Sequence, residues 1–204
     1  MKRHLLFLVS IFCTLSVMAQ DMKTVFVAMP DSIVPLLTKV NREDCIDFLD
    51  SNMKAVVKNR FGNVAEMKVL TDDFVEIEPS GASSMQVRML PAGGDTLLCV
   101  VNTVKAEAAD SRISFYTKGW EKVPAKGLFE APAIKDFFAS ADSAALYADR
   151  CDIYLVGLEL SQTGNTLTAE YTMPDYMNES DSALIRPLLR RIVYCWNGKR
   201  FVRE

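Results

Sequence analysis

The sequence has almost no histidine, since the single copy among its 204 residues is His4, at the start of the chain. Histidine is the side chain that most often performs acid–base catalysis and metal binding near neutral pH. A Ser-His-Asp triad, a Cys-His pair and a His-ligated zinc site are therefore excluded beyond this position. The GxSxG, P-loop and GxGxxG motifs are also missing. We expect no catalytic residues, no metal site and no cofactor.

Long hydrophobic segments are missing as well. The one strongly apolar run covers residues 5–17, behind Lys2 and Arg3, and it is too short for a transmembrane helix. A small-residue cleavage pattern ends at Ala19. Together these features are typical of a secretory signal peptide over residues 1–19. We expect an exported protein in the periplasm, at the outer membrane or outside the cell, and not an integral membrane protein.

The chain has no excess of positive charge. Removing Lys2 and Arg3 from its 23 basic residues leaves 21 against 26 acidic ones, which is a formal net charge of −5. Binding to nucleic acid requires clustered basic side chains, and binding to an anionic membrane surface requires a polybasic segment. We expect neither partner.

Cysteine is scarce and widely spaced. The chain beyond residue 19 holds four cysteines, and no two of them form a CxxC or zinc-knuckle pattern. An even number in an exported chain allows two disulfides, in any of three pairings. The alternative is that each thiol is a small apolar core residue. The four residues are Cys45, Cys99, Cys151 and Cys195.

In the first half of the chain, helical spacing of apolar residues gives way to strand-like alternation. After a mobile lead, we expect a short helix capped by Asp31 or Ser32 up to Leu37. A longer helix should run from Asn41 until Gly62 ends it, with a break near residues 50–52. Strands forming an antiparallel meander follow at residues 67–70, 74–78, 85–90, 96–104 and 113–117.

The second half repeats this change of pattern after a segment rich in turn residues. Residues 118–133 contain two glycines and two prolines, which indicates a connector. Helical spacing covers residues 134–148 and a single turn within 181–189. Two hairpins are expected, one over residues 152–173 and one around Asn197-Gly198, joining strands at 191–196 and 199–202.

The order of one helical region and then about four strands, occurring twice, predicts an α+β fold of antiparallel meanders backed by helices. We expect two tandem helix-plus-four-strand units, over residues 20–117 and 134–204, joined by the connector at 118–133. The alternative is one continuous antiparallel sheet backed by helices in a single domain.

Several stretches resemble an uncharacterised family of exported Bacteroidetes proteins, a domain of unknown function numbered 3256. The resemblance covers nearly the whole chain beyond residue 19. It implies a Gram-negative envelope setting and assigns no catalytic residue. The stretches that carry it are Met29-Pro30-Asp31-Ser32, Leu36-Leu37, Asn41-Arg42, Leu70-Thr71-Asp72-Asp73, Asn102-Thr103-Val104, Asp110-Ser111-Arg112-Ile113-Ser114-Phe115-Tyr116 and Trp196-Asn197-Gly198-Lys199-Arg200-Phe201-Val202.

One short pattern is over-represented. Asp followed by Ser or Thr and then an aliphatic or small residue occurs four times, against about one expected by chance at ordinary residue frequencies. It resembles the O-glycosylation sequon of exported Bacteroidetes proteins. The alternative is helix capping, because Asp-Ser is a good N-cap and three of the four copies precede helical spacing. The hydroxyl residues are Ser32, Thr96, Ser143 and Ser182.

Aromatic residues occupy corresponding positions near the ends of the two halves. Trp120 and Trp196 lie near turns, and Tyr116 and Tyr194 precede them. If these side chains are exposed, they can stack on a sugar or anchor a protein partner, and replacing either tryptophan with alanine should then abolish binding without unfolding. The alternative is that they close the core against a turn.

Carboxylates are the remaining candidates for catalysis without histidine. A glycoside hydrolase needs two carboxyl groups across a sugar, one of them kept protonated by apolar surroundings. By residue type alone, the candidates are solvated loop or strand residues as readily as catalytic ones. They are Asp72-Asp73, Glu76 with Glu78, and Glu159 with Glu170.

These observations favour a non-enzymatic binding module of the cell envelope that holds a protein or glycan partner. The export signal, the missing histidine and the missing catalytic motifs support this hypothesis. A carboxylate-based glycoside hydrolase and a purely structural envelope protein are the alternatives.

Overall fold

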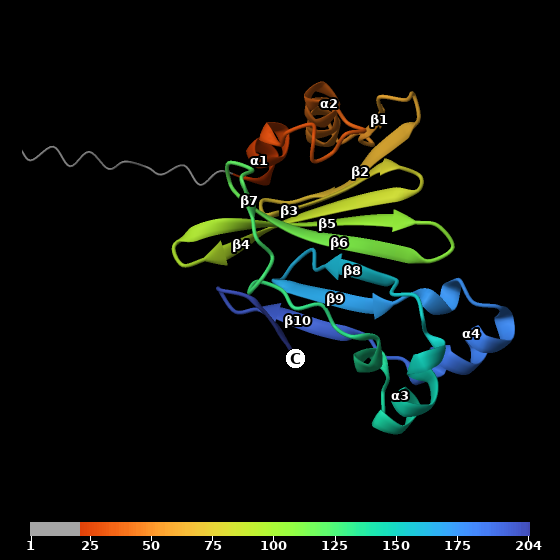
Figure 1. Ribbon diagram of the computed structural model, residues 1–204. Coiled ribbons are helices and arrows are strands. Elements are labelled where there is room, and N and C mark those ends of the chain that lie inside the picture. The colour runs from red at the N-terminus through yellow and green to blue at the C-terminus, as the bar shows by residue number, and fades with distance from the viewer. Residues whose placement is uncertain (1–20) are drawn as a thin grey trace, which may run out of the picture.

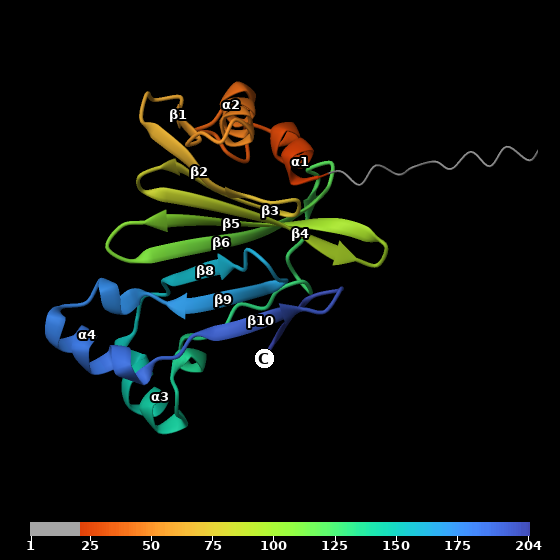
Figure 2. The same ribbon diagram turned by 180° about the vertical axis from the view of Figure 1, so that it is seen from behind.

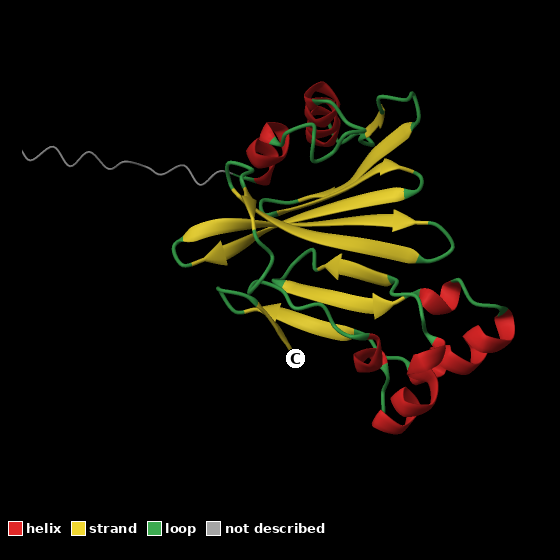
Figure 3. Cartoon of the chain, in the orientation of Figure 1, coloured by secondary structure: helices red, strands yellow, loops and turns green. Residues whose placement is uncertain are grey.

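The computed structural model describes residues 21–204, and the expected signal peptide and its cleavage site lie outside the described residues. The described chain contains two antiparallel sheets and four α-helices (Figures 1 and 3). The predicted α+β class with antiparallel meanders is therefore confirmed. None of the helices within residues 21–204 is long and apolar enough to span a bilayer.

The larger sheet contains seven strands whose order in space is their order in the chain. Each strand is antiparallel to its neighbours. The five predicted strands of this meander are confirmed as β2 to β6. The strands are β1 (Val56–Lys58), β2 (Val64–Leu70), β3 (Phe74–Ser80), β4 (Ser83–Ala92), β5 (Asp95–Lys105), β6 (Ala109–Thr117) and β7 (Lys122–Val123).

The smaller sheet contains both hairpins expected in the second half. Its order is β11-β10-β9-β8, and all neighbours are antiparallel. Gly198 turns the last hairpin at a φ of 90°, a conformation that favours glycine. The strands are β8 (Val156–Leu160), β9 (Thr166–Tyr171), β10 (Ile192–Trp196) and β11 (Phe201–Arg203). Seven and four strands do not confirm a tandem of two helix-plus-four-strand units.

Short helices cluster at one end of the smaller sheet (Figures 1 and 2). Each helical region consists of one α-helical piece between two 3₁₀ pieces. The α-helices are α3 (Ala141–Tyr147) and α4 (Glu179–Ile185). The 3₁₀ helices are η1 (Ile134–Phe137), η2 (Ala148–Arg150), η3 (Met173–Asp175) and η4 (Arg186–Leu188).

Two hydrophobic cores lie on opposite faces of the larger sheet. The helices α1 (Met22–Ala28) and α2 (Lys39–Asp50) cover one face, and the smaller sheet packs against the other (Figure 1). Strand β5 shows why, since Leu98 and Val100 belong to the first core and Cys99 and Val101 to the second. A strand buried on both faces reads as a continuous apolar run, and residues 97–101 of β5 form such a run.

Polar side chains of the larger sheet bind the edge of the smaller one. The Leu158 N–H donates to Ser111 Oγ at 2.9 Å, and the Leu160 N–H donates to Gln86 Oε1 at 2.8 Å. Arg88 donates to the Ser161 and Gln162 carbonyls from β4. These bonds satisfy main-chain groups that an edge strand would otherwise leave unpaired.

The N-terminal region corrects three predictions. The expected mobile lead is helix α1, whose N-cap is Asp21. The expected helix at residues 31–37 is a series of turns, because the Asp31 carboxylate binds arginines instead of capping a helix. The second helix ends at Asp50 and not near Gly62, because the chain from Val56 pairs with β2 as strand β1.

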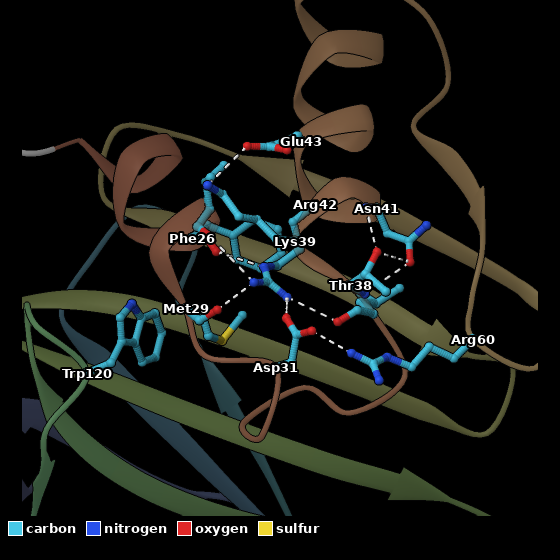
Figure 4. Close-up of polar contacts among 12 residues, drawn as sticks. Phe26, Met29, Asp31, Thr38, Lys39, Asn41, Arg42, Glu43, Arg60 and Trp120 are labelled. Atoms are coloured by element: carbon cyan, nitrogen blue, oxygen red, sulfur yellow. Dashed lines mark hydrogen bonds and ion pairs between the residues drawn. The ribbon is translucent and has the colours of Figure 1, made fainter.

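A buried arginine joins the pieces of this region (Figure 4). Arg42 on α2 is 1% exposed. Its Nε donates to the Phe26 carbonyl at 3.1 Å, its Nη2 donates to the Met29 carbonyl, and its Nη1 donates to the Leu37 carbonyl at 3.1 Å and to Asp31 Oδ1 at 3.0 Å. The acceptors include carbonyls at the C-terminal end of α1, where a helix leaves its last carbonyls without the usual intrahelical donors.

Replacing Arg42 with methionine should destabilise the fold strongly, since it removes the guanidinium that donates to several buried carbonyls and to the Asp31 carboxylate. We expect a loss of about 3 to 5 kcal/mol in the free energy of unfolding, measured by urea denaturation. Arg60→Met is the matched control, because Arg60 binds the same carboxylate from a largely exposed position and should lose far less. Equal losses for the two variants would contradict this role of Arg42.

Stability should also depend on pH through Asp31. The hydrogen bond from Arg42 lowers the pKa of Asp31. A carboxyl group whose pKa is lower in the folded state stabilises the fold above its unfolded pKa of about 3.9 and stops doing so as the pH falls through its folded pKa. Asp31→Asn should therefore be less stable than the parent at pH 7 and converge with it below pH ~4. Urea midpoints across this range test the convergence.

Glu107→Gln is the control for this titration. Glu107 lies exposed on the turn between β5 and β6 and forms no ion pair with any described residue. A constant difference between Asp31→Asn and the parent at every pH would argue against the Asp31–Arg42 linkage.

Candidate functional site

The structure places both tryptophans in the core. Trp120 is 6% exposed, and its Nε1 donates to the Val25 carbonyl at 2.9 Å. Trp196 is 8% exposed, and its Nε1 donates to the Pro91 carbonyl at 2.7 Å. Each indole therefore joins a turn to a distant element through its N–H group. Neither ring presents an open face for stacking on a partner.

The two candidate tyrosines differ in their surroundings. Tyr116 is half-buried and lies against Trp120, with 5.6 Å between ring centroids. Tyr194 on β10 is 4% exposed, and it lines a cleft of about 620 Å³. The structure does not bring the two tyrosines into one site, because they belong to the two separate cores.

All four candidate cysteines are free thiols in the structure. Cys45, Cys99 and Cys151 are buried in the cores, and Cys195 is half-buried. Burial raises the pKa of Cys45 to about 11 and also raises the pKa of Cys99 and Cys151. Because the thiolate is the reactive form, these buried thiols are poor nucleophiles.

The Asp-Ser/Thr pattern does not supply the helix caps. The N-caps of α3 and α4 are Ser140 and Asn178, which precede the Asp-Ser pairs by two and three residues. Among the candidate glycosylation residues, Ser32 is exposed, and the others, Thr96, Ser143 and Ser182, are half-buried.

A groove between the two sheets collects three of the candidate glutamates. Glu76, Glu159 and Glu170 line a groove of about 220 Å³ together with hydroxyl and amide side chains. Glu78 does not line the groove and binds Lys68 and Lys105 instead. Glu170 binds Arg191 at 2.9 Å. The groove supplies carboxylates in contact with solvent, without the apolar pocket that keeps a catalytic acid protonated. No group of His, Cys, Asp and Glu within residues 21–204 is arranged to hold a metal ion.

The cleft lined by Tyr194 lies between the connector and the end of the chain. It has a volume of about 620 Å³, which is within the range of ligand-binding pockets. We call it the connector cleft. Its lining residues are Lys126–Pro132, Asp136, Tyr194 and Arg200–Arg203.

Aromatic contacts form the floor of the connector cleft. The Phe129 ring packs edge-on against Tyr194, with 5.2 Å between centroids, and against Phe201 at 6.4 Å. The Phe201 N–H donates to the Leu128 carbonyl at 2.8 Å, and this bond attaches the connector to β11. The Tyr154 hydroxyl donates to the Pro132 carbonyl at 2.9 Å. The connector wall is therefore held at both ends.

The polar groups of the connector cleft are unevenly satisfied. Arg203 is held by Asp136, whose Oδ2 lies 3.5 Å from Nη1 and whose carbonyl accepts from Nη2. Lys126, Glu130 and Arg200 are exposed and form no ion pair within residues 21–204. The lining thus carries three basic and two acidic side chains in a chain with an acidic excess.

Tyr194 is the most informative lining residue. Its hydroxyl has no hydrogen-bond partner among residues 21–204, although the residue is almost completely buried. Burial raises the pKa of Tyr194, while Arg203 acts in the opposite sense. At neutral pH the hydroxyl is therefore a neutral donor that opens into the cleft.

Sequence reasoning identified Tyr194 but missed Lys126, Phe129, Arg200 and Arg203. The signals available were the glycine- and proline-rich connector and the Asn197-Gly198 hairpin, each recognised separately. Nothing in the residue pattern places them side by side, because they are about 70 residues apart in the chain.

Comparison with known proteins places the chain in a family. It matches the family described as "Protein of unknown function (DUF3256)" over residues 14–201. The chain belongs to the DUF3256 family. The resemblance noted in the sequence is therefore confirmed. No functionally curated protein matches the chain.

A solved structure shares the DUF3256 fold seen here. It is described as the structure of a domain of an uncharacterized protein from Porphyromonas gingivalis W83. The two chains are 26% identical, with a TM-score of 0.77 over 89% of this chain and 96% of the other.

The buried indoles generate a stability prediction. Trp120→Ala and Trp196→Ala should each lower the free energy of unfolding by about 3 to 5 kcal/mol, since each removes a large core side chain and leaves a carbonyl unpaired. Urea denaturation measures the loss. The phenylalanine variants, which keep a ring but lose the N–H, should lose less. Alanine variants as stable as the parent would restore a direct role in partner binding.

Proposed function

We propose that this DUF3256 protein is an exported, non-enzymatic binding module of the cell envelope that holds its partner in the connector cleft. The observation that carries the proposal is the Tyr194 hydroxyl, a polar group on a buried residue that lacks a partner and opens into the cleft. The hydroxyl itself is open to solvent, so it is free to donate a hydrogen bond to a ligand in the cleft.

The surroundings of this hydroxyl support binding. The cleft combines an aromatic floor with a few polar groups, which is the usual composition of a ligand site. It lacks histidine, and its two carboxylates are divided between an ion pair with Arg203 and the exposed Glu130. The secretory pattern at the N-terminus supports export. Hydrolysis would require the glutamate groove, which is lined by hydroxyl and amide side chains and lacks the apolar pocket that surrounds a catalytic acid.

Site-specific photo-crosslinking tests the proposal. A photoreactive residue at Val202, which is 38% exposed and lines the cleft, should capture an envelope component in cells of the host. The same residue at Phe61, which is 77% exposed on the turn between β1 and β2, is the control and should not. Tyr194→Phe should reduce capture at Val202 while leaving stability nearly unchanged.

Tyr176→Phe is the matched control for the lost hydroxyl, because Tyr176 is exposed near α4 and remote from the cleft. Capture that is equal at Val202 and Phe61, or absent from both, would reject the cleft as a binding site. Fractionation with cell-wall material in that case would favour a structural envelope protein.

A further inference from the structure

We propose that the occupant of the connector cleft is an extended, acidic peptide segment that pairs with the outer edge of β11. This inference rests on the proposed function of the cleft as the binding site and specifies the chemistry of the partner. The main-chain groups of β11, the charges around it and the coverage of the other sheet edges support it.

The hydrogen bonds of β11 show which of its main-chain groups face the cleft. The Asn197 N–H donates to the Arg200 carbonyl, and the Glu204 N–H donates to the Val193 carbonyl. Even-numbered residues therefore bond toward β10, and Phe201 and Arg203 point their main-chain groups the other way. On that side, the Phe201 N–H reaches the Leu128 carbonyl. The Phe201 carbonyl and the Arg203 N–H and carbonyl have no main-chain partner within residues 21–204.

An open strand edge beside a cleft is a template for another strand. Unpaired N–H and C=O groups in a row bind an extended peptide through main-chain hydrogen bonds, while pockets for its side chains provide specificity. The connector wall meets β11 at a single main-chain bond and then diverges from it, which leaves the cleft volume along the rest of the edge.

The other outer strands do not offer an equivalent edge. Ser111 and Gln86 already occupy the outward N–H groups of β8 at Leu158 and Leu160. Strand β7 has two residues. Strand β1 lies beside α2, and its Lys58 carbonyl accepts from Asn41. Within the described chain, the open edge that also lines a large cleft is that of β11.

The charges at this edge favour an acidic segment. Arg200 and Lys126 lie at the cleft without acidic partners among residues 21–204, so both are available to carboxylates. Arg203 is engaged by Asp136, and Glu130 is the acidic lining residue without an ion pair. The Tyr194 hydroxyl donates to a carbonyl or carboxylate of the bound chain.

Titration of the full chain beyond residue 19 with synthetic peptides tests this pairing. The probe is a capped hexapeptide of alternating threonine and glutamate, because β-branched residues favour the extended conformation. Nuclear magnetic resonance should show saturable shifts in β11 and slower exchange of the Arg203 amide. The same peptide with N-methyl groups on the residues that face β11 should not bind, since it cannot donate to the strand.

Variants of Arg203 and Arg200 separate the contribution of main-chain pairing from that of charge. Arg203→Pro removes the cleft-facing N–H and is tolerated on an edge, whereas Arg203→Ala removes only the side chain. The proline variant should bind at least several-fold more weakly than the alanine variant. Arg200→Glu should weaken binding of the acidic peptide by about tenfold or more, and a threonine–lysine peptide should recover it.

Each other result overturns the proposal. Equal binding of the methylated peptide contradicts strand pairing, and equal binding of the lysine peptide to the parent contradicts the charge preference. If no peptide binds while Val202 still captures an envelope component, the occupant is of another class and the proposed function stands. If neither experiment shows binding, both proposals fail.

Discussion

The larger sheet carries apolar side chains on both faces, and the other layers of the molecule cover those two faces. Its central strand β5 alternates between the two cores at every residue from Leu98 to Val101. Exposing either face would leave a large apolar surface in water, at about 25 cal/mol for each Å². Helices α1 and α2 cover one face and the smaller sheet covers the other, which leaves the connector to pass between the layers.

Buried polar side chains decide how the layers are oriented. Hydrophobic burial is not directional, whereas Arg42 donates to several particular carbonyls, and Gln86 and Ser111 each accept from one main-chain N–H. Arg88 on β4 acts in the same way, since it donates to two carbonyls of the turn after β8. It also binds the carboxylate of Asp73, which lies between β2 and β3, at 2.7 Å. These contacts connect elements that are distant in the sequence, so the arrangement of the layers depends on them.

The connector cleft is a consequence of this layered arrangement. The connector must descend from the edge of the larger sheet to the short helices beyond the smaller one, and β11 lies along its path (Figure 1). The connector meets β11 at Leu128, and Phe129 then packs on Tyr194. The path of the connector thereby brings three features together in the connector cleft. They are the outer main-chain edge of β11, the hydroxyl of Tyr194 and the basic side chains of Lys126 and Arg200. The solved domain from Porphyromonas gingivalis W83 shares the overall fold.

The sequence by itself determined the strands, the hairpins, the α+β class and the family, because these depend on local alternation, turn residues and matching stretches. It misplaced the N-terminal helices, since the carboxylate of Asp31 caps no helix once Arg42 is buried beside it. It left the tryptophans open between surface and core, and only packing decided that both indoles are buried. The connector cleft was also decided by tertiary structure alone, because the residues on its two walls meet only when the smaller sheet has folded.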